Sequence, residues 1–143
     1  MSVVGGLIVL VVVLVAASAA GFGVRARQGR FRPQKPDVLT PADLGAPLGE
    51  RATLVQFSTE FCTYCGPTRE ILAVMASERD GVAFVEIDAA DRMDLTRRLR
   101  VMSTPTVLVL GADGAIESRS SGQPRRSDLL AAVGTVLGGG GGS

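Results

Sequence analysis

Two cysteines separated by two residues, Cys62 and Cys65, constrain this chain more than any other feature. They are its only cysteines. A short apolar segment, residues 53–57, runs up to them, and a pattern typical of a helix, residues 69–79, follows them. A strand, a cysteine pair and a helix in this order place the first sulfur at a helix N-terminus, where unpaired N–H groups and the positive dipole end gather. Such a field stabilises the thiolate, so the pattern predicts a lowered pKa for Cys62 and a reactive pair.

The residues that the chain lacks exclude several kinds of chemistry. It has no histidine, which is the usual general base and the commonest metal ligand, so serine–histidine and cysteine–histidine catalysis are excluded. Two cysteines do not complete a tetrahedral zinc site, which takes about four protein ligands, and we predict no metal. From Pro36 onward acidic residues outnumber basic ones, and no basic–aromatic pattern predicts nucleic-acid binding.

Residues 2–24 form a long uncharged stretch of mainly valine, alanine, glycine and leucine. At roughly 23 residues it is long enough to cross a bilayer as one helix. A cleaved signal peptide is the alternative, because Ala17-Ser18-Ala19 resembles a cleavage site, but such peptides normally have a basic start and a shorter apolar core. A buried helix of a soluble protein is disfavoured, because no face of the stretch is polar. We therefore predict that residues 1–24 are a transmembrane helix or signal anchor.

A basic run without any acidic residue follows this stretch and consists of Arg25, Arg27, Arg30, Arg32 and Lys35. The positive-inside tendency predicts that this run, and the domain after it, lie in the cytoplasm. The extracytoplasmic face is the alternative. Residues 25–36 contain two prolines and show no apolar period, so we interpret them as a basic juxtamembrane linker.

Residues 37–137 show the pattern of an α/β domain. The expected strands are Ala52–Ser58, Val82–Ile87, Thr106–Leu110 and Ile116–Ser121, and the expected helices run from Cys62 or Thr63 to Glu78, from Asp91 to Leu99 and from Asp128 to Leu137. The β-α-β order favours parallel pairing of the first two strands, and the turn at residues 112–115 favours an antiparallel hairpin of the last two. We expect a mixed sheet with helices on both faces.

Smaller signals complete this interpretation. Thr40 before Pro41 is a pattern that caps a short helical turn. Met93, Leu95 and Leu99 are the expected inward residues of the second helix, and Ser127 is the expected cap of the last one. Residues 138–143 are glycine-rich and predict a flexible tail.

The cysteine pair, the Ser103-Thr104-Pro105-Thr106 segment about forty residues later, and Gly122 before the last helix together resemble a thioredoxin-like domain. The resemblance covers residues 37–137 and implies a three-layer α/β/α fold, here preceded by one transmembrane helix. It also implies a cis bond between Thr104 and Pro105, facing the cysteines, and a substrate-binding role for Thr104 and Pro105. An ordinary trans proline that begins a strand is the alternative.

Three departures from the family pattern stand out. Reductase-type members commonly have a tryptophan directly before the first cysteine, where this chain has Phe61. They commonly have Gly-Pro between the two cysteines, where this chain has Thr63-Tyr64. A tyrosine directly before the second cysteine is similar to glutaredoxins. Gln56 stands where many thioredoxins carry a buried aspartate, and an amide does not accept a proton as a carboxylate does. Water or Glu60 would then handle the proton. A shifted motif beginning at Cys65 is the less favoured register, because it changes the spacing from the strand.

The resemblance implies a membrane-anchored thiol–disulfide oxidoreductase that needs no cofactor beyond a redox-active Cys62–Cys65 disulfide. Cys62 would attack a client disulfide, and Cys65 would resolve the mixed disulfide. The partners would be protein disulfide or dithiol clients and an electron donor that the sequence does not identify. Phe61 and Tyr64 would contact the client, or else only pack against the domain. The alternatives are an inert buried cysteine pair, a non-catalytic membrane-tethered binding module, and a glutathione-dependent enzyme, for which the sequence shows no site.

Overall fold

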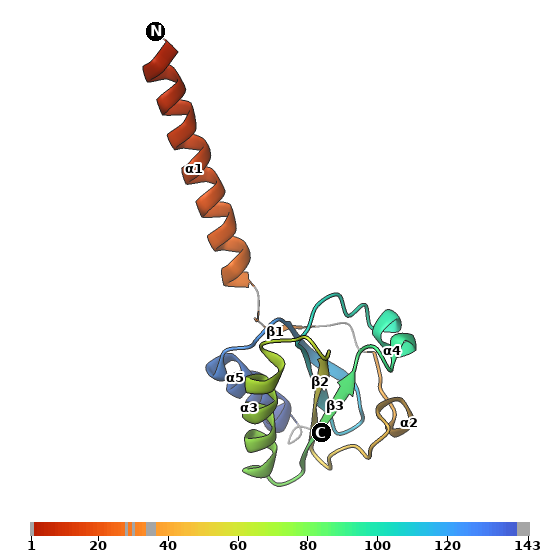
Figure 1. The fold of residues 1–143 in the computed structure, drawn as a ribbon. Coiled ribbons are helices and arrows are strands. Elements are labelled where there is room, and N and C mark those ends of the chain that lie inside the picture. Colours follow the sequence, from red (N-terminus) through yellow and green to blue (C-terminus); the bar gives the residue numbers. More distant parts are fainter. Residues whose placement is uncertain (1, 28, 30, 34–36, 140–143) are drawn as a thin grey trace.

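The computed structural model describes residues 2–27, 29, 31–33 and 37–139 of the chain (Figure 1). A long helix stands apart from a domain built of one sheet and four shorter helices. The helices are α1 (Ser2–Arg27), α2 (Pro41–Leu44), α3 (Cys65–Ser77), α4 (Met93–Arg98) and α5 (Arg126–Gly139). The strands are β1 (Phe31–Pro33), β2 (Ala52–Ser58), β3 (Val82–Asp88), β4 (Thr106–Gly111) and β5 (Ile116–Ser121).

The sheet has five strands in the order β1-β5-β4-β2-β3. Strand β2 pairs parallel to β3 and antiparallel to β4, and β5 is antiparallel to both β4 and β1. All seven residues of β2 are buried, as its largely apolar composition predicts for a strand covered on both faces. The mixed sheet, the parallel first pair and the final hairpin are therefore confirmed.

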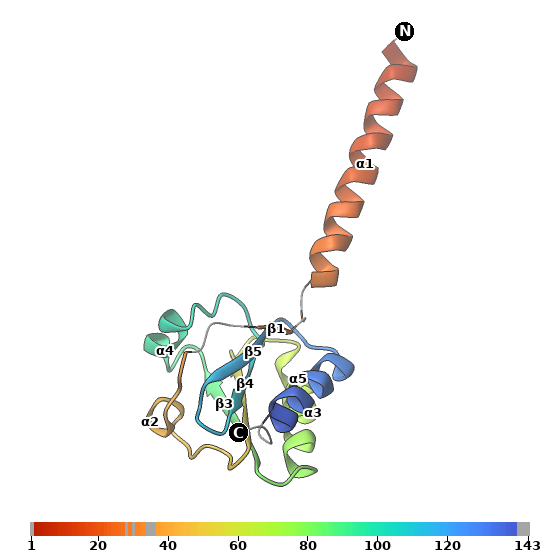
Figure 2. The ribbon, with the colours of Figure 1, turned by 180° about the vertical axis from the view of Figure 1, so that it is seen from behind.

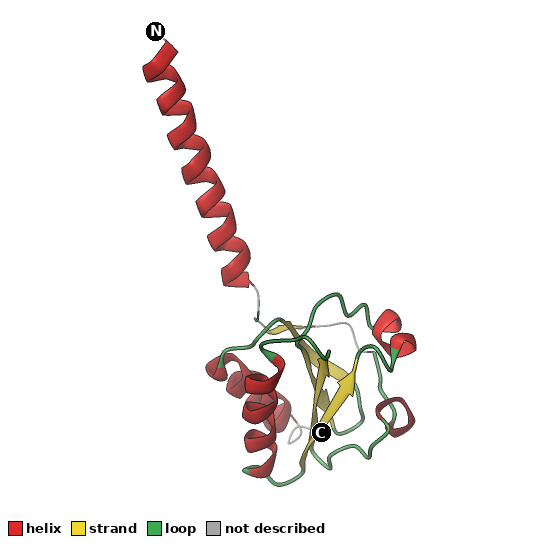
Figure 3. Cartoon of the chain, viewed as in Figure 1, coloured by secondary structure: helices red, strands yellow, loops and turns green. Residues whose placement is uncertain are grey.

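Helices cover the two faces of the sheet in pairs, which gives three layers (Figures 2 and 3). One core lies under α3 and α5 and contains Leu54, Leu72, Met75, Val107, Val109, Leu129 and Val133. The other lies on the opposite face, toward α2 and α4, and includes Leu44, Val55, Phe57, Leu95, Leu99 and Leu108. Alternate residues of β2 enter opposite cores, because successive strand side chains point to opposite faces. The predicted α/β/α architecture is confirmed.

Two helix starts differ from the prediction. Helix α3 begins at Cys65, because Cys62 lies in a turn in which its N–H donates to the Thr59 carbonyl oxygen (3.3 Å). Helix α5 begins at Arg126, and the Leu129 N–H already donates to the Arg125 carbonyl oxygen (3.0 Å). Ser127 therefore lies inside the helix, and its prediction as the cap was wrong.

The inward face of α4 was predicted correctly at two of three positions. Leu95 and Leu99 are buried, whereas Met93 is 47% exposed. Residues four apart lie on the same helix face, but residues two apart point in nearly opposite directions, so Met93 turns away when Leu95 turns inward.

Strand β1 lies within the segment that the sequence pattern predicts as a linker. Phe31 pairs with Ser120 and Pro33 with Ser118, which makes β1 a short edge strand beside β5. An edge strand tolerates proline and needs no alternating apolar pattern, so the usual signals of a strand are weak here. The sheet consequently begins before residue 37, the predicted start of the domain.

Thr40 caps α2 through reciprocal hydrogen bonds with Asp43. The Asp43 N–H donates to Thr40 Oγ1 (3.2 Å), and the Thr40 N–H donates to Asp43 Oδ2 (2.9 Å), with Pro41 at the first helical position as predicted. Replacing Thr40 with alanine should lower the free energy of unfolding by about 1 kcal/mol. Urea unfolding measures this loss; Thr135→Ala, on the exposed face of α5, is the control and should stay within about 0.5 kcal/mol of the wild type.

The same cap makes stability depend on pH. The hydrogen bond from the Thr40 backbone, followed by the Thr40 side chain and Arg98, holds the pKa of Asp43 below its ordinary value of 3.8. A lowered folded-state pKa means that the ionised carboxylate stabilises the fold above the unfolded-state pKa, and that this contribution is lost as the pH falls through the folded-state pKa. Asp43→Asn should therefore lose stability at neutral pH and show a shallower loss on acidification than the wild type. Unfolding curves between pH 7 and pH 2 test this, with Asp80→Asn as the control.

Helix α1 is 26 residues long, and its most apolar window has a mean hydropathy of 2.8 with none of its residues buried. At about 1.5 Å per residue it extends roughly 39 Å, enough to cross a bilayer. It ends at Arg27, three residues beyond the predicted boundary, so Arg25 and Arg27 belong to its last turn. The helix is thus long and apolar enough for a membrane span, a test that a signal sequence also passes.

Candidate redox-active site

Cys62 and Cys65 form a disulfide at the end of β2, with an S–S distance of 2.12 Å and a Cα–Cα distance of 5.4 Å. Cys62 lies in the turn after β2, and Cys65 is the first residue of α3. The bond therefore places both sulfurs at the N-terminal end of α3, although the helix starts later than predicted. Cys65 is only 2% exposed, whereas Cys62 is half-buried. An incoming thiol or disulfide thus has access to Cys62 first.

Gln56 lies in β2, between β3 and β4, and its side chain contacts the backbone of Cys65. Its side chain is fully buried, and Nε2 donates to the Cys65 carbonyl oxygen (2.9 Å). The Gln56 Oε1 atom is buried without a hydrogen-bond partner among the described residues. The amide therefore ties the first residue of α3 to β2 and places no ionisable group there. Glu60, the other side chain considered for proton handling, is exposed in the turn before Cys62.

The loop before β4 lies against the turn that contains Cys62. The Thr104–Pro105 peptide bond is cis, as the resemblance implies. Thr104 Oγ1 lies 3.3 Å from Thr59 Oγ1, and the carbonyl of Thr59 accepts the Cys62 N–H. Thr104 is half-buried and Pro105 is buried. The structure thus brings Thr104 and Pro105 to the cysteine turn through Thr59, a residue that the sequence analysis did not single out.

Three exposed apolar side chains belong to these two loops, and we call them the apolar rim: Phe61, Tyr64 and Met102. Phe61 is 91% exposed and Tyr64 is 58% exposed, so neither packs in the core. Met102, two residues before Thr104, is also 91% exposed and was not predicted. In the sequence it is one apolar residue among many, and its exposure is evident only in the fold. Apolar and aromatic side chains of this exposure are typical of protein interfaces.

Arg119 of β5 holds the loop that carries Met102. Its guanidinium donates to the carbonyl oxygens of Leu99 (2.6 Å) and Arg100 (2.9 Å), just after α4. Burial of the guanidinium lowers the pKa of Arg119 from its ordinary value. Arg100 has a positive φ of 52°, so the chain turns sharply at this point. The hydrogen bonds satisfy carbonyls at the helix end and fix where the loop begins.

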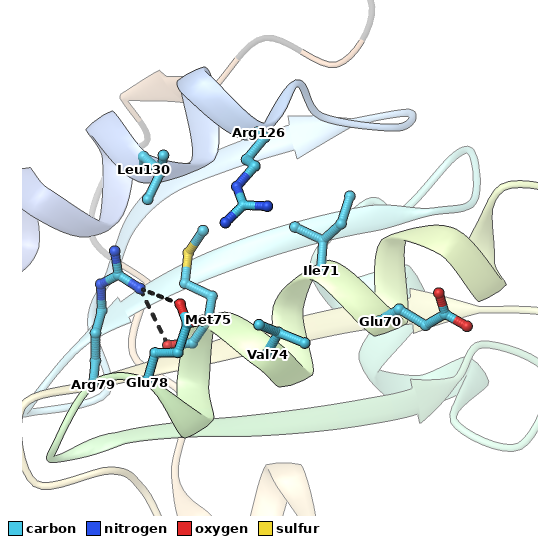
Figure 4. A pocket seen from close by; sticks show the side chains of 8 residues that line it. All are labelled: Glu70, Ile71, Val74, Met75, Glu78, Arg79, Arg126 and Leu130. Carbon is cyan, nitrogen blue, oxygen red and sulfur yellow. Dashed lines mark hydrogen bonds and ion pairs between the residues drawn. The ribbon is translucent and has the colours of Figure 1, made fainter.

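A hollow of about 190 Å³ lies between α3 and α5, away from the cysteines (Figure 4). Helix α3 contributes Val74 and Met75, and α5 contributes Arg126 and Leu130. Arg79 lies at one end, where its guanidinium is 3.9 Å from Glu78. No described lining residue is a cysteine, serine or threonine. The hollow thus offers no nucleophile, and we assign it no catalytic role.

The described part of the chain holds no group of three or more His, Cys, Asp or Glu side chains arranged to bind a metal ion. The chemistry that the site supports is that of its two sulfurs, one accessible and one buried. Such a pair exchanges disulfides through a mixed disulfide at the accessible sulfur.

Comparison with known proteins gives a consistent result. The sequence profile of the Thioredoxin family matches residues 41–135. A thioredoxin of Echinococcus granulosus is 36% identical over 52 residues, which are 34% of this chain and 49% of that protein, so the chain spans about half of its curated relative.

Solved structures agree in fold. Chloroplastic thioredoxin z covers 75% of this chain and 98% of its own, with a TM-score of 0.58 and 23% identity. The thioredoxin NaTrxh from Nicotiana alata covers 59% of this chain and 71% of its own, with a TM-score of 0.52 and 24% identity. A mutant thioredoxin from Halobacterium salinarum has a TM-score of 0.55 at 17% identity and covers 62% of this chain and 76% of its own. At this level of identity the likeness concerns the fold.

Proposed function

The chain belongs to the thioredoxin family, and from this premise we propose that it is a membrane-anchored thiol–disulfide oxidoreductase that exchanges disulfides with protein clients. The observation that carries the proposal is the unequal exposure of the bonded pair, with Cys65 at 2% and Cys62 half-buried. An enzyme of this kind needs one sulfur that meets the client and one that is shielded from it. Family membership and the Thr59–Thr104 contact beside the pair support the same conclusion.

The exchange balances without a cofactor. In the reduced protein the Cys62 thiolate attacks one sulfur of a client disulfide, a Cys62–client bond forms, and the other client sulfur leaves as a thiolate that takes up a proton. Cys65 then loses its proton and attacks Cys62 Sγ, which releases the second client sulfur. The second client sulfur also leaves as a thiolate and takes up a proton. The client thus gains two electrons from the pair and two protons, one from Cys65 and one from the solvent that took the Cys62 proton, and the Cys62–Cys65 disulfide remains. A protein dithiol reverses the same steps and restores the reduced pair.

Redox equilibration tests this exchange directly. The full chain in detergent is incubated with graded ratios of reduced and oxidised dithiothreitol, and free thiols are then alkylated and counted. We expect one two-electron transition, and we expect the reduced protein to pass both electrons to a soluble disulfide-bonded peptide. A pair that stays oxidised throughout, or that never reduces the peptide, would contradict the proposal.

We propose that α1 anchors the protein and that the domain lies in the cytoplasm. The apolar length of α1 supports the span, and Arg25 and Arg27 in its last turn support the orientation. A membrane-impermeant maleimide applied to intact cells after mild reduction tests the orientation, because Cys62 and Cys65 are the only thiols. We expect labelling only after permeabilisation, and none in a variant with both cysteines replaced. Labelling of intact cells would place the domain on the other face and leave the exchange chemistry unaffected.

A further inference from the structure

The chain is pinned to the sheet almost as soon as it leaves α1. Helix α1 ends at Arg27, and the Gly29 N–H donates to the Ser121 carbonyl oxygen at 2.7 Å, so one residue separates the helix from a fixed point. Gly29 has a φ of 79°, and a Cβ atom there would lie 2.2 Å from the Gln123 carbonyl oxygen. Only glycine fits this close approach. The domain therefore has a very short tether, fixed at a defined point of the sheet.

This fixed point lies at the same end of the sheet as the cysteines. Phe31 pairs with Ser120, Ser121 pairs with Thr106, and Thr106 pairs with Phe57 at the end of β2. Strands β1 and β2 are three strand spacings apart, roughly 14 Å. Figure 1 shows β1 and the first turn of α3 at the end of the domain nearest α1, and the last turn of α3 at the far end.

The tether limits how far the cysteines can move from a membrane that α1 spans. Arg25 and Arg27, in the last turn of α1, are exposed and favour the headgroup region. A domain that tilts about Gly29 keeps the cysteine turn within roughly 20 Å of that point, because the turn lies about three strand spacings away. A large soluble client would have to enter the narrow space between the domain and the bilayer.

The apolar rim lies on this membrane-facing end. Phe61 and Met102 are each 91% exposed, and they come from the two loops that Thr59 and Thr104 hold together beside Cys62. Aromatic and methionine side chains at such a place favour a protein partner that covers them. A protein that is itself embedded in the bilayer, with a segment close to the membrane surface, lies within reach of the apolar rim.

From the tether, the sheet register and the apolar rim we infer that the client is an integral membrane protein whose cysteine pair lies close to the bilayer surface. This inference rests on the membrane anchor and disulfide exchange proposed above, and it adds the class of client. The alternative is that the apolar rim contacts only lipid. The experiments below distinguish a membrane-protein client from lipid.

A set of clients with cysteines at different heights tests the inference. Each client has a transmembrane helix, a helical spacer of 0 or 30 residues, and a disulfide-bonded pair; the longer spacer raises the pair by about 45 Å. With the full chain in the same vesicles, we expect the near pair to be reduced at least about tenfold faster than the far one, because the tether raises its effective concentration. Equal rates, or a faster far pair, would overturn the inference.

An insertion variant provides the matched comparison. Twenty-four Gly/Ser residues placed between Arg27 and residue 28 add a coil of roughly 27 Å and should reduce the height preference to about twofold or less. The same residues added after Ser143 should leave it unchanged. A soluble disulfide peptide separates the two proposals: if no variant reduces it, both fail; if all reduce it equally while height has no effect, only the inference fails.

The fluorescence of Tyr64 reports the orientation directly, because it is the only tyrosine and the chain has no tryptophan. In the reduced full chain, we expect nitroxide groups on lipid headgroups to quench Tyr64, and the insertion between Arg27 and residue 28 to weaken this quenching. Absence of headgroup quenching would overturn the inference. Stronger quenching by bromine atoms on the acyl chains would overturn it as well, because it would place the rim in lipid instead of against a protein.

Discussion

Cys62→Ser is expected to reduce disulfide exchange to the rate without protein, whereas Cys65→Ser should still attack the client and then stop at the mixed disulfide. The reason is the unequal exposure of the pair: Cys62 is half-buried and accessible to a client sulfur, whereas Cys65 is only 2% exposed. Non-reducing electrophoresis with a disulfide-bonded client peptide measures both results. A mixed disulfide that forms on Cys65 in the Cys62→Ser variant would reverse the assigned roles.

Stability has to be separated from chemistry in this comparison. Either substitution removes a cross-link that closes a loop of four residues, which costs about 2 kcal/mol in the chain-entropy account. The matched reference is therefore the reduced wild type, not the oxidised one. If Cys62→Ser matches the reduced wild type in unfolding but supports normal function in cells, the protein acts as a non-catalytic binding module instead of an enzyme.

Phe57→Ala is expected to lower the free energy of unfolding by about 3–5 kcal/mol. Phe57 is fully buried in β2, between β3 and β4, in the core that faces α2 and α4. For a domain of this size the loss corresponds to a fall in Tm on the order of 20 °C. Thermal unfolding of the full chain in detergent, followed by circular dichroism, measures it.

Met93→Ala is the control for this experiment. Met93 was predicted to point inward, but its side chain is 47% exposed, so its removal should change stability by no more than about 0.5 kcal/mol. A loss of several kcal/mol in Met93→Ala would mean that the face of α4 is assigned wrongly. A loss below about 1 kcal/mol in Phe57→Ala would mean that the β2 core relaxes around the cavity.

The elements that could be predicted are those whose signal is local. The largely apolar segment of β2 identified a buried strand with its observed bounds, because strands covered on both faces are rich in apolar residues. Asp113-Gly114 in the turn before β5 identified the hairpin from the sequence, and Gly114 has the positive φ, 85°, that favours glycine. Thr40 and Pro41 likewise identified α2.

What escaped prediction depends on contacts between distant segments. Strand β1 forms because it can pair with the edge of β5. The three residues of β1 contain no local signal that predicts this pairing. Thr59, in the turn that contains Cys62, contacts Thr104, which lies 45 residues away in the sequence. Met102 appears in the sequence as one more apolar residue; only the fold shows that its side chain is exposed, in the loop that Thr104 joins to Thr59.

The role of Gln56 was predictable in part. Its position in β2 identified it as a buried residue that brings no carboxylate near the cysteines. Its hydrogen bond to the Cys65 carbonyl was not predictable, because it depends on how α3 packs against the sheet. The side chain thus fixes the geometry of the pair, a role that residue type alone did not indicate.

The pairing of β1 with β5 has a consequence for biosynthesis. The ribosome makes α1 and β1 first and β5 near the end, so the first strand has no partner until most of the domain has been translated. Insertion of α1 would hold the unfinished chain beside the membrane during that interval, with the edge of the growing sheet still open. The junction between α1 and the domain is therefore among the last parts to form, and a chain released early would contain α1 while lacking a closed sheet.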